Sequence, residues 1–170
     1  MLKRIGTIFM VMILFGSLLN IGCAEEKELI TAQDGDVIKV HYTGTLNDGT
    51  IFDTSRGRQS LEFTLGAGQL IPGFENAVRG MSVGQSKTVT IPPEEAYGPF
   101  RDDLIFTIDK GRLPDSSNPE IGQQLQIELS GNISTQAIIT DVSETTITVD
   151  ANHHLAGKDL TFEIEVVEIR

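Results

Sequence analysis

The sequence is short of aromatic residues, cysteine and positive charge. Its 170 residues include no tryptophan, one cysteine, and 13 lysines and arginines against 24 aspartates and glutamates, a net charge of −11. A surface of this sign repels a phosphate backbone, so we expect no nucleic-acid partner. A single cysteine cannot close an internal disulfide. These two shortages exclude nucleic-acid-binding proteins and disulfide-stabilised scaffolds.

Several catalytic motifs are missing as well. The chain has no CxxC pair, no phosphate-binding glycine loop and no Ser-His-Asp arrangement, so redox, nucleotide and triad chemistry are disfavoured. The adjacent His153 and His154 suggest metal ligands, but neighbours on a strand face opposite sides of a sheet and do not chelate together. We therefore expect neither a metal site nor a cofactor.

The first 22 residues differ from the rest of the chain. Basic residues at positions 3 and 4 precede an almost wholly apolar stretch that ends at Gly22, a pattern typical of a signal peptide. Cys23 follows in a setting that resembles a bacterial lipobox, although Asn20 replaces the usual aliphatic residue. Lipidation of Cys23 is favoured over ordinary secretion or an uncleaved membrane span. Residues 23–34 would then form a tether.

This N-terminus predicts where the protein resides. We expect an exported monomer of a bacterial cell envelope that faces the periplasm or the cell exterior. Its contact with the membrane would be the N-terminal anchor alone.

The stretch from Gly66 to Met81 is apolar and nearly uncharged. Pro72 suits the first turn of a helix and Gly80 a left-handed helix end, which predicts a short helix between them. Apolar residues at i, i+3, i+4 and i+7 give this helix one face that should pack on a sheet. They are Phe74, Ala77, Val78 and Met81.

The start of this helix is a candidate binding site. Leu70, Ile71 and Phe74 lie there beside a backbone N–H that the helix leaves free. Apolar side chains around such a donor can form a cavity for a ligand with a carbonyl oxygen.

Strand patterns flank the predicted helix. Residues 37–43, 50–55 and 61–65 precede it and residues 84–91 follow it, each with the composition or alternation of a strand. Residues 47–49, Asn-Asp-Gly, supply a tight hairpin turn between the first two strands. This order predicts an α+β fold, an antiparallel sheet curled around one short helix.

Six motifs, in this order, resemble those of the FKBP-type peptidyl-prolyl cis/trans isomerases. They are Val40–Gly44, Gly49–Asp53, Leu70–Phe74, Gly80–Gly84, Ile91–Gly98 and Leu160–Val166. The resemblance assigns residues 35–98 and 151–170 to an FKBP-like isomerase domain. It points to the SlyD-like branch, in which an intervening segment, here 99–150, is a chaperone domain inserted into the flap.

The intervening segment contains strand patterns of its own. They cover residues 104–108, 124–129, 135–140 and 145–149. A sheet face or edge left uncovered there would hold unfolded polypeptides. The first pattern is the most apolar, and we expect it to bind clients through Leu104, Ile105, Phe106 and Ile108.

The resemblance also implies the residues of the site. The catalytic set is Tyr42, Phe52, Asp53 and Tyr97, and the substrate-binding set is Leu70, Ile71, Phe74, Leu155 and Phe162. The Tyr97 hydroxyl and the Ile71 backbone N–H would bind substrate carbonyls, and Asp53 would orient Tyr42 or polarise the cavity. Better-known eukaryotic members have tryptophan where this chain has Phe74 and an aromatic residue where it has Leu61.

Such a site would act on unfolded or proline-containing polypeptides. Rotation about the bond before proline meets a barrier of about 18–20 kcal/mol, and an apolar, water-poor cavity favours the twisted amide because its charges are smaller. We expect a peptidyl-prolyl cis/trans isomerase that assists folding, with chaperone activity from residues 99–150. The alternative is a holdase that keeps the fold without catalysis. A nickel-handling role is disfavoured because no His- and Cys-rich tail is present.

Overall fold

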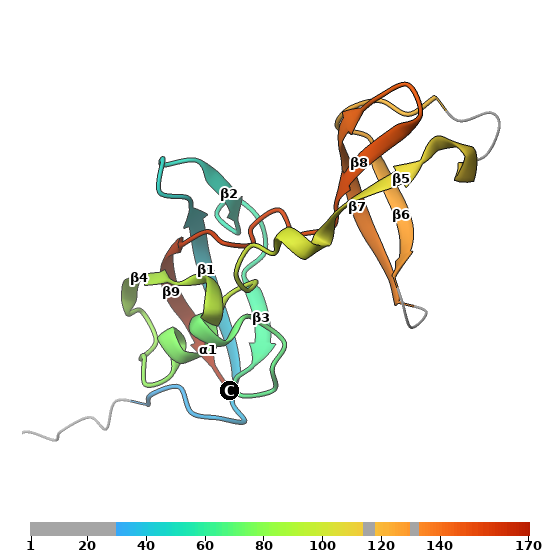
Figure 1. Cartoon of the computed structure of the whole chain (residues 1–170). Helices are drawn as coiled ribbons and strands as arrows, with labels where there is room; N and C mark the ends of the chain where they lie inside the picture. Colours follow the sequence, from blue (N-terminus) through green and yellow to red (C-terminus); the bar gives the residue numbers. More distant parts are fainter. Residues whose placement is uncertain (1–29, 114–117, 130–132) are drawn as a thin grey trace, which may run out of the picture.

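The computed structural model describes residues 30–113, 118–129 and 133–170 (Figure 1). The predicted signal peptide, Cys23 and the first part of the tether lie outside these ranges. Within them, no helix has the length and apolar character needed to cross a membrane. The described chain forms two lobes, each built on one antiparallel sheet, and two segments join the lobes (Figure 1).

The sheet of the first lobe contains five of the described strands. They are β1 (Val37–Thr45), β2 (Ile51–Thr54), β3 (Leu61–Thr64), β4 (Ser86–Ile91) and β9 (Leu160–Ile169). The long strands β1 and β9 pair with each other, β2 and β3 both pair with β1, and β4 pairs with β9, always antiparallel. Strands form where the sequence predicts them.

Helix α1 (Pro72–Val78) packs on this sheet beside β4 and β9 (Figure 1). Pro72 begins the helix, and Gly80 lies just beyond its end with φ of +79°, a conformation that glycine adopts without strain. The predicted apolar face is buried, since Phe74, Ala77, Val78 and Met81 are each at most 4% exposed. A helix of seven residues depends on such burial for its stability. The predicted α+β fold is therefore confirmed.

The second lobe is a four-stranded antiparallel sheet. Its strands are β5 (Ile105–Asp109), β6 (Gln124–Leu129), β7 (Ile133–Val142) and β8 (Thr146–Asp150), in the order β5-β8-β7-β6. Each of the four predicted strand patterns is a strand. Among the described residues this lobe has its own buried cluster, made of Ala137, Ile139, Ile147 and Val149.

Backbone and side-chain hydrogen bonds connect the two segments that join the lobes. The Gly157 N–H donates to the Gly98 carbonyl at 2.9 Å, and the Ala151 N–H donates to the Leu104 carbonyl at 3.0 Å. Between these two bonds, Asn152 contacts both backbone groups of Arg101. The segments therefore run as a bonded pair. The proposed boundaries of a chaperone domain, 99–150, stay a prediction.

Candidate active site

A cavity of about 420 Å³ opens beside the start of α1. Eight predicted site residues line it together: Tyr42, Phe52, Asp53, Leu70, Ile71, Phe74, Tyr97 and Phe162. They come from β1, β2, β9, α1, the loop before α1 and the segment after β4. Leu61 and Gln69 complete the lining. The fold thus gathers side chains from distant parts of the sequence around one opening.

Aromatic rings form the inner wall of this cavity. Phe74 is 3% exposed and meets Phe162 edge-to-face, with ring centroids 5.2 Å apart and planes at 85°. The ring centroids of Tyr42 and Phe74 are 5.8 Å apart and those of Phe52 and Phe162 are 5.5 Å apart, and the ring planes of both pairs are again nearly perpendicular. Edge-to-face pairs are the favourable geometry for aromatic side chains. Each ring is therefore held in place by its neighbours, which makes the wall apolar and rigid.

Gly44 on β1 leaves room for one of these rings. A Cβ at this position would lie 2.5 Å from Cζ of Phe52 and 3.1 Å from Cε1 of Phe162. Such distances are closer than packed atoms allow. The register between β1 and β2 shifts between Gly44 and Thr45, so the pairing is irregular at the same point. The absence of a side chain at Gly44 thus leaves the space that the Phe52 ring occupies.

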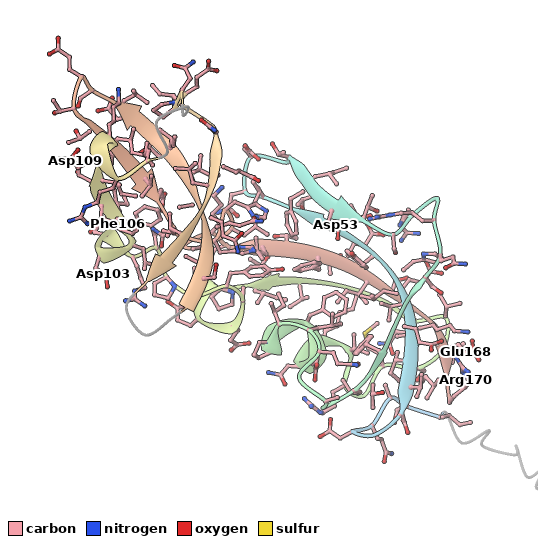
Figure 2. All side chains as sticks on the ribbon, turned by 90° about the vertical axis from the view of Figure 1, so that its right-hand side faces the viewer. Asp53, Asp103, Phe106, Asp109, Glu168 and Arg170 are labelled. Carbon is pink, nitrogen blue, oxygen red and sulfur yellow. The ribbon has the colours of Figure 1, made fainter. Side chains whose placement is uncertain are left out.

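Asp53 lies at the rim of the cavity, on the lobe that contains α1 (Figure 2). The Tyr42 hydroxyl donates to one carboxylate oxygen of Asp53. The other oxygen accepts from Nη2 of Arg58 at 2.6 Å and from the Thr54 N–H at 2.8 Å. Arg58 is itself fixed, because its Nε donates to the Thr54 carbonyl at 2.7 Å. The carboxylate therefore orients Tyr42 against the cavity.

These contacts change the acidity of both groups. Burial, together with the hydrogen bond to Asp53 and the negative charge of Asp53, raises the pKa of Tyr42 to about 12. The hydrogen bond from Tyr42 lowers the pKa of Asp53, assisted by Arg58 and Thr54 and opposed by partial burial. Tyr42 is therefore a neutral phenol, and Asp53 a carboxylate, throughout the neutral pH range.

Glu75 is a supporting residue that sequence reasoning missed. Its side chain is 6% exposed, and its carboxylate accepts the N–H groups of Gly66 at 2.9 Å and Leu70 at 3.3 Å. These bonds hold the loop that places Leu70 and Ile71 at the cavity. Among the described residues, the Ile71 N–H has no acceptor. The signal in the sequence is an acid in the first helical turn after a glycine-containing loop.

Tyr97 stands at the mouth of the cavity and is 42% exposed. Its ring stacks on that of His153, with centroids 3.9 Å apart and planes inclined by 6°. His153 and His154 lie in a turn region before β9, and their rings are 4.5 Å apart. The expectation that they face opposite sides of a sheet was wrong because this segment is not a strand. In the described ranges, no three His, Cys, Asp or Glu side chains form a metal-binding group.

Some predicted site residues lie outside the cavity lining. Leu155 is 4% exposed and packs in the core of the first lobe instead. On β5, Phe106 and Ile108 pack against the core of the second lobe, whereas Ile105 is 37% exposed. Leu104 precedes β5 and is partly buried. Because side chains alternate along a strand, the predicted client-binding run is divided between two faces.

Comparison with known proteins identifies the family. Most of the chain, residues 29–167, matches the FKBP-type peptidyl-prolyl cis-trans isomerase family. The chain belongs to this family. The predicted resemblance to FKBP-type isomerases is therefore confirmed.

Curated FKBP-type relatives align with most of the chain. It is 39% identical over 134 residues to the FKBP-type peptidyl-prolyl cis-trans isomerase SlyD of Treponema pallidum, covering 79% of this chain and 76% of the relative. It is 39% identical over 144 residues to the short-type peptidyl-prolyl cis-trans isomerase of Methanocaldococcus jannaschii, covering 84% and 88%. With the FKBP-type 16 kDa peptidyl-prolyl cis-trans isomerase of Escherichia coli it shares 34% over 141 residues, covering 82% and 94%.

Proposed function

We propose that this FKBP-type isomerase acts on the peptide bond before proline in unfolded polypeptides, and that the ring-lined cavity at α1 is its catalytic site. The observation that carries the proposal is the cavity itself. Phe52, Phe74 and Phe162 enclose a space of about 420 Å³ that is open to solvent at Tyr97. A prolyl ring with one residue on either side fits an enclosure of this size and apolar character.

The enclosure lowers the rotation barrier by favouring the twisted amide. A planar amide has larger charges on its oxygen and nitrogen than the twisted form, in which conjugation is lost. Transfer from water to an apolar wall therefore costs the planar form more than the twisted form. No bond to the protein forms or breaks, so the reaction needs no nucleophile.

Two donors would hold the substrate backbone on either side of proline. The Ile71 N–H and the Tyr97 hydroxyl have no hydrogen-bond partner among the described residues, and both residues line the cavity. Substrate carbonyls bound at these groups would leave the prolyl bond over the aromatic wall. Binding at both sides fixes the flanking residues while the bond between them rotates.

Tyr42 and Asp53 would act without transferring a proton. The Asp53 carboxylate holds the Tyr42 hydroxyl, and Arg58 holds the carboxylate. The three groups keep the Tyr42 ring against Phe74 and Phe162. Their contribution is therefore the shape and polarity of the rim.

The experiment is a prolyl-peptide isomerisation assay of residues 24–170. We expect catalysis above the spontaneous rate, with a loss when the cavity is altered. A rate equal to the spontaneous one would reject the enzyme assignment and leave the holdase alternative.

We also propose that the second lobe binds unfolded clients, which would be the chaperone function of the protein. Two features support this. In the described chain, β5 pairs only with β8 and β6 only with β7, so each presents an unpaired edge to an extended segment. Ile105 and Ile138 are 37% and 39% exposed and offer apolar contacts. Capture there would raise the concentration of prolyl bonds near the cavity.

Finally, we propose that Cys23 carries a lipid that holds the protein at a bacterial cell-envelope membrane. The support is the sequence alone: a basic start, an apolar run and a cysteine directly after it. Metabolic labelling with a fatty acid should label the wild-type protein and not Cys23→Ser. An unlabelled wild-type protein would leave secretion or a single membrane span.

A further inference from the structure

The connection between the lobes brings a histidine onto the tyrosine at the mouth of the cavity. Tyr97 precedes the segment that leads to β5, and His153 lies on the segment that returns from β8. Their rings are parallel to within 6°, with centroids 3.9 Å apart. Tyr97 is otherwise 42% exposed. The imidazole therefore covers one face of an aromatic ring that is otherwise partly open to solvent.

His153 is itself well placed to hold another ring. Its Nδ1 accepts the N–H of Leu155 at 3.2 Å, and Leu155 is buried in the core of the first lobe. The preceding residue, Asn152, accepts the Arg101 N–H and donates to the Arg101 carbonyl, both at 2.9 Å. The imidazole is thus fixed by its bond to Leu155, and the backbone before it is held by the paired segments through Asn152.

We propose that His153 is a positioning residue for prolyl isomerisation: its neutral imidazole holds the Tyr97 ring where the Tyr97 hydroxyl meets a substrate carbonyl. This inference rests on the proposed function, in which Tyr97 belongs to the site. His153 is not a lining residue of the cavity and acts through Tyr97. Because it lies on the connection to the second lobe, it also links that lobe to the mouth of the cavity.

The contact requires the neutral form of the histidine. Both nitrogens of a protonated imidazole carry hydrogen, so Nδ1 could no longer accept the Leu155 N–H. Burial and, secondarily, His154 lower the pKa of His153. The other titratable groups near the ring are Tyr97, which stacks on it, and Asp150 and Lys158, which line the adjoining hollows.

A lowered pKa fixes the sign of the pH dependence. The folded protein favours neutral His153, so the stack is fully formed above the ordinary histidine pKa of 6.5 and is lost as pH falls through the lowered value. Isomerase activity should therefore decline on acidification. The decline should begin below the ordinary histidine range.

The test compares His153→Leu with the matched control His154→Leu in a prolyl-tetrapeptide assay at pH 7.5. His153→Leu should lower kcat/KM about threefold to tenfold, the range that loss of one aromatic stack produces. His154→Leu should change it by less than about twofold. His153→Phe, which keeps a flat ring beside Tyr97 but lacks the Nδ1 acceptor for the Leu155 N–H, should recover part of the loss and remove the acid decline. Equal activities of the two leucine variants would overturn the proposal.

A double-variant cycle separates positioning from a merely structural role. In a Tyr97→Ala background, His153→Leu should cause no further loss if it acts through Tyr97. A full additional loss would show that His153 acts by another route and overturn the proposal.

Two further readings keep the outcomes distinct. The ring resonances of Tyr97, recorded by NMR without substrate, should shift on His153→Phe and far more on His153→Leu, and unchanged resonances would overturn the proposal even if His153→Leu proved unstable. A wild-type chain without catalysis would instead overturn the proposed function, whatever the ring resonances show.

Discussion

The two lobes build their cores from different side chains. Among the described residues, the first core includes the buried rings of Phe63, Phe74 and Phe162, with Tyr42 and Phe52 packed against them. The fully buried residues of the second core are aliphatic, with Phe106 packed at their side. Perpendicular rings leave a rigid concave wall, whereas interlocked aliphatic side chains fill the space between strands. The first core thus supplies the wall that the proposed catalysis needs, whereas the proposed client binding by the second lobe would have to use its edges and exposed side chains.

The largest effects are expected from substitution of two equally buried isoleucines, one in each core. Ile164 on β9 and Ile139 on β7 are each 0% exposed, one in each core. Substitution of either by alanine should lower the free energy of unfolding of its own lobe by about 2–5 kcal/mol. Only Ile164→Ala should reduce activity on a short peptide, because only its lobe holds the cavity. Hydrogen exchange, read lobe by lobe, and the peptide assay check both statements.

One outcome of these two substitutions would contradict separate tasks for the two lobes. If Ile139→Ala lowered peptide activity as much as Ile164→Ala, the lobes would unfold as one cooperative unit. The assignment of separate tasks would then lose its structural basis.

Smaller effects are expected from two substitutions at the cavity, which test whether its side chains carry the activity of the first lobe. Phe52→Ala and Tyr97→Ala should each lower kcat/KM on a prolyl peptide by about 10- to 100-fold, which corresponds to about 1.4–2.7 kcal/mol of transition-state stabilisation. In the proposed site, Phe52 supplies an enclosing ring and Tyr97 a hydrogen-bond donor at the mouth of the cavity. Tyr97→Ala should leave the thermal unfolding midpoint nearly unchanged because this side chain is 42% exposed. Unaltered kinetics in both variants would remove these residues from the site.

The smallest expected effect concerns pH. The raised pKa of Tyr42 means that its neutral form is favoured by folding, so its contribution is present below the ordinary value of 10.0 and is lost as pH rises toward about 12. The lowered pKa of Asp53 means the opposite, a contribution present above 3.8 and lost as pH falls below it. Between about pH 5 and 9 this pair should leave peptide activity flat. The measurement is the peptide activity of the His153→Phe variant as a function of pH over that range, where no inflection is expected. An inflection that remained in this variant would contradict the roles given to Tyr42 and Asp53.

The elements were predictable because their signals are local. The strand patterns at β1 and β6 and the pairing of Pro72 with Gly80 depend only on neighbouring residues. The residues of the cavity lining were predicted from motifs that resemble a known family, because no hydrophobic periodicity indicates that Tyr42 and Tyr97 lie close together. Sequence reasoning therefore located the aromatic wall well.

The missed features depend on contacts between distant segments. The bonds from Gly66 and Leu70 to Glu75 form only once the loop folds back on α1. The stack of His153 on Tyr97 needs the two connecting segments to pair. The prediction that His153 and His154 face opposite sides of a sheet was wrong because it assumed a strand where the chain turns.

The most direct test of the central claim replaces residues 99–150 with a short flap loop. The first lobe keeps its sheet, α1 and the cavity, so the variant should fold. Its activity on a four-residue peptide should change by less than about tenfold, whereas its catalysis of a proline-limited refolding reaction should fall by about 100-fold or more, because captured clients no longer present their prolyl bonds at high effective concentration. The measurement is both rates on this one variant. A refolding rate that falls far more than the peptide rate supports the division of tasks between the lobes, and an equal loss in the two assays would contradict it.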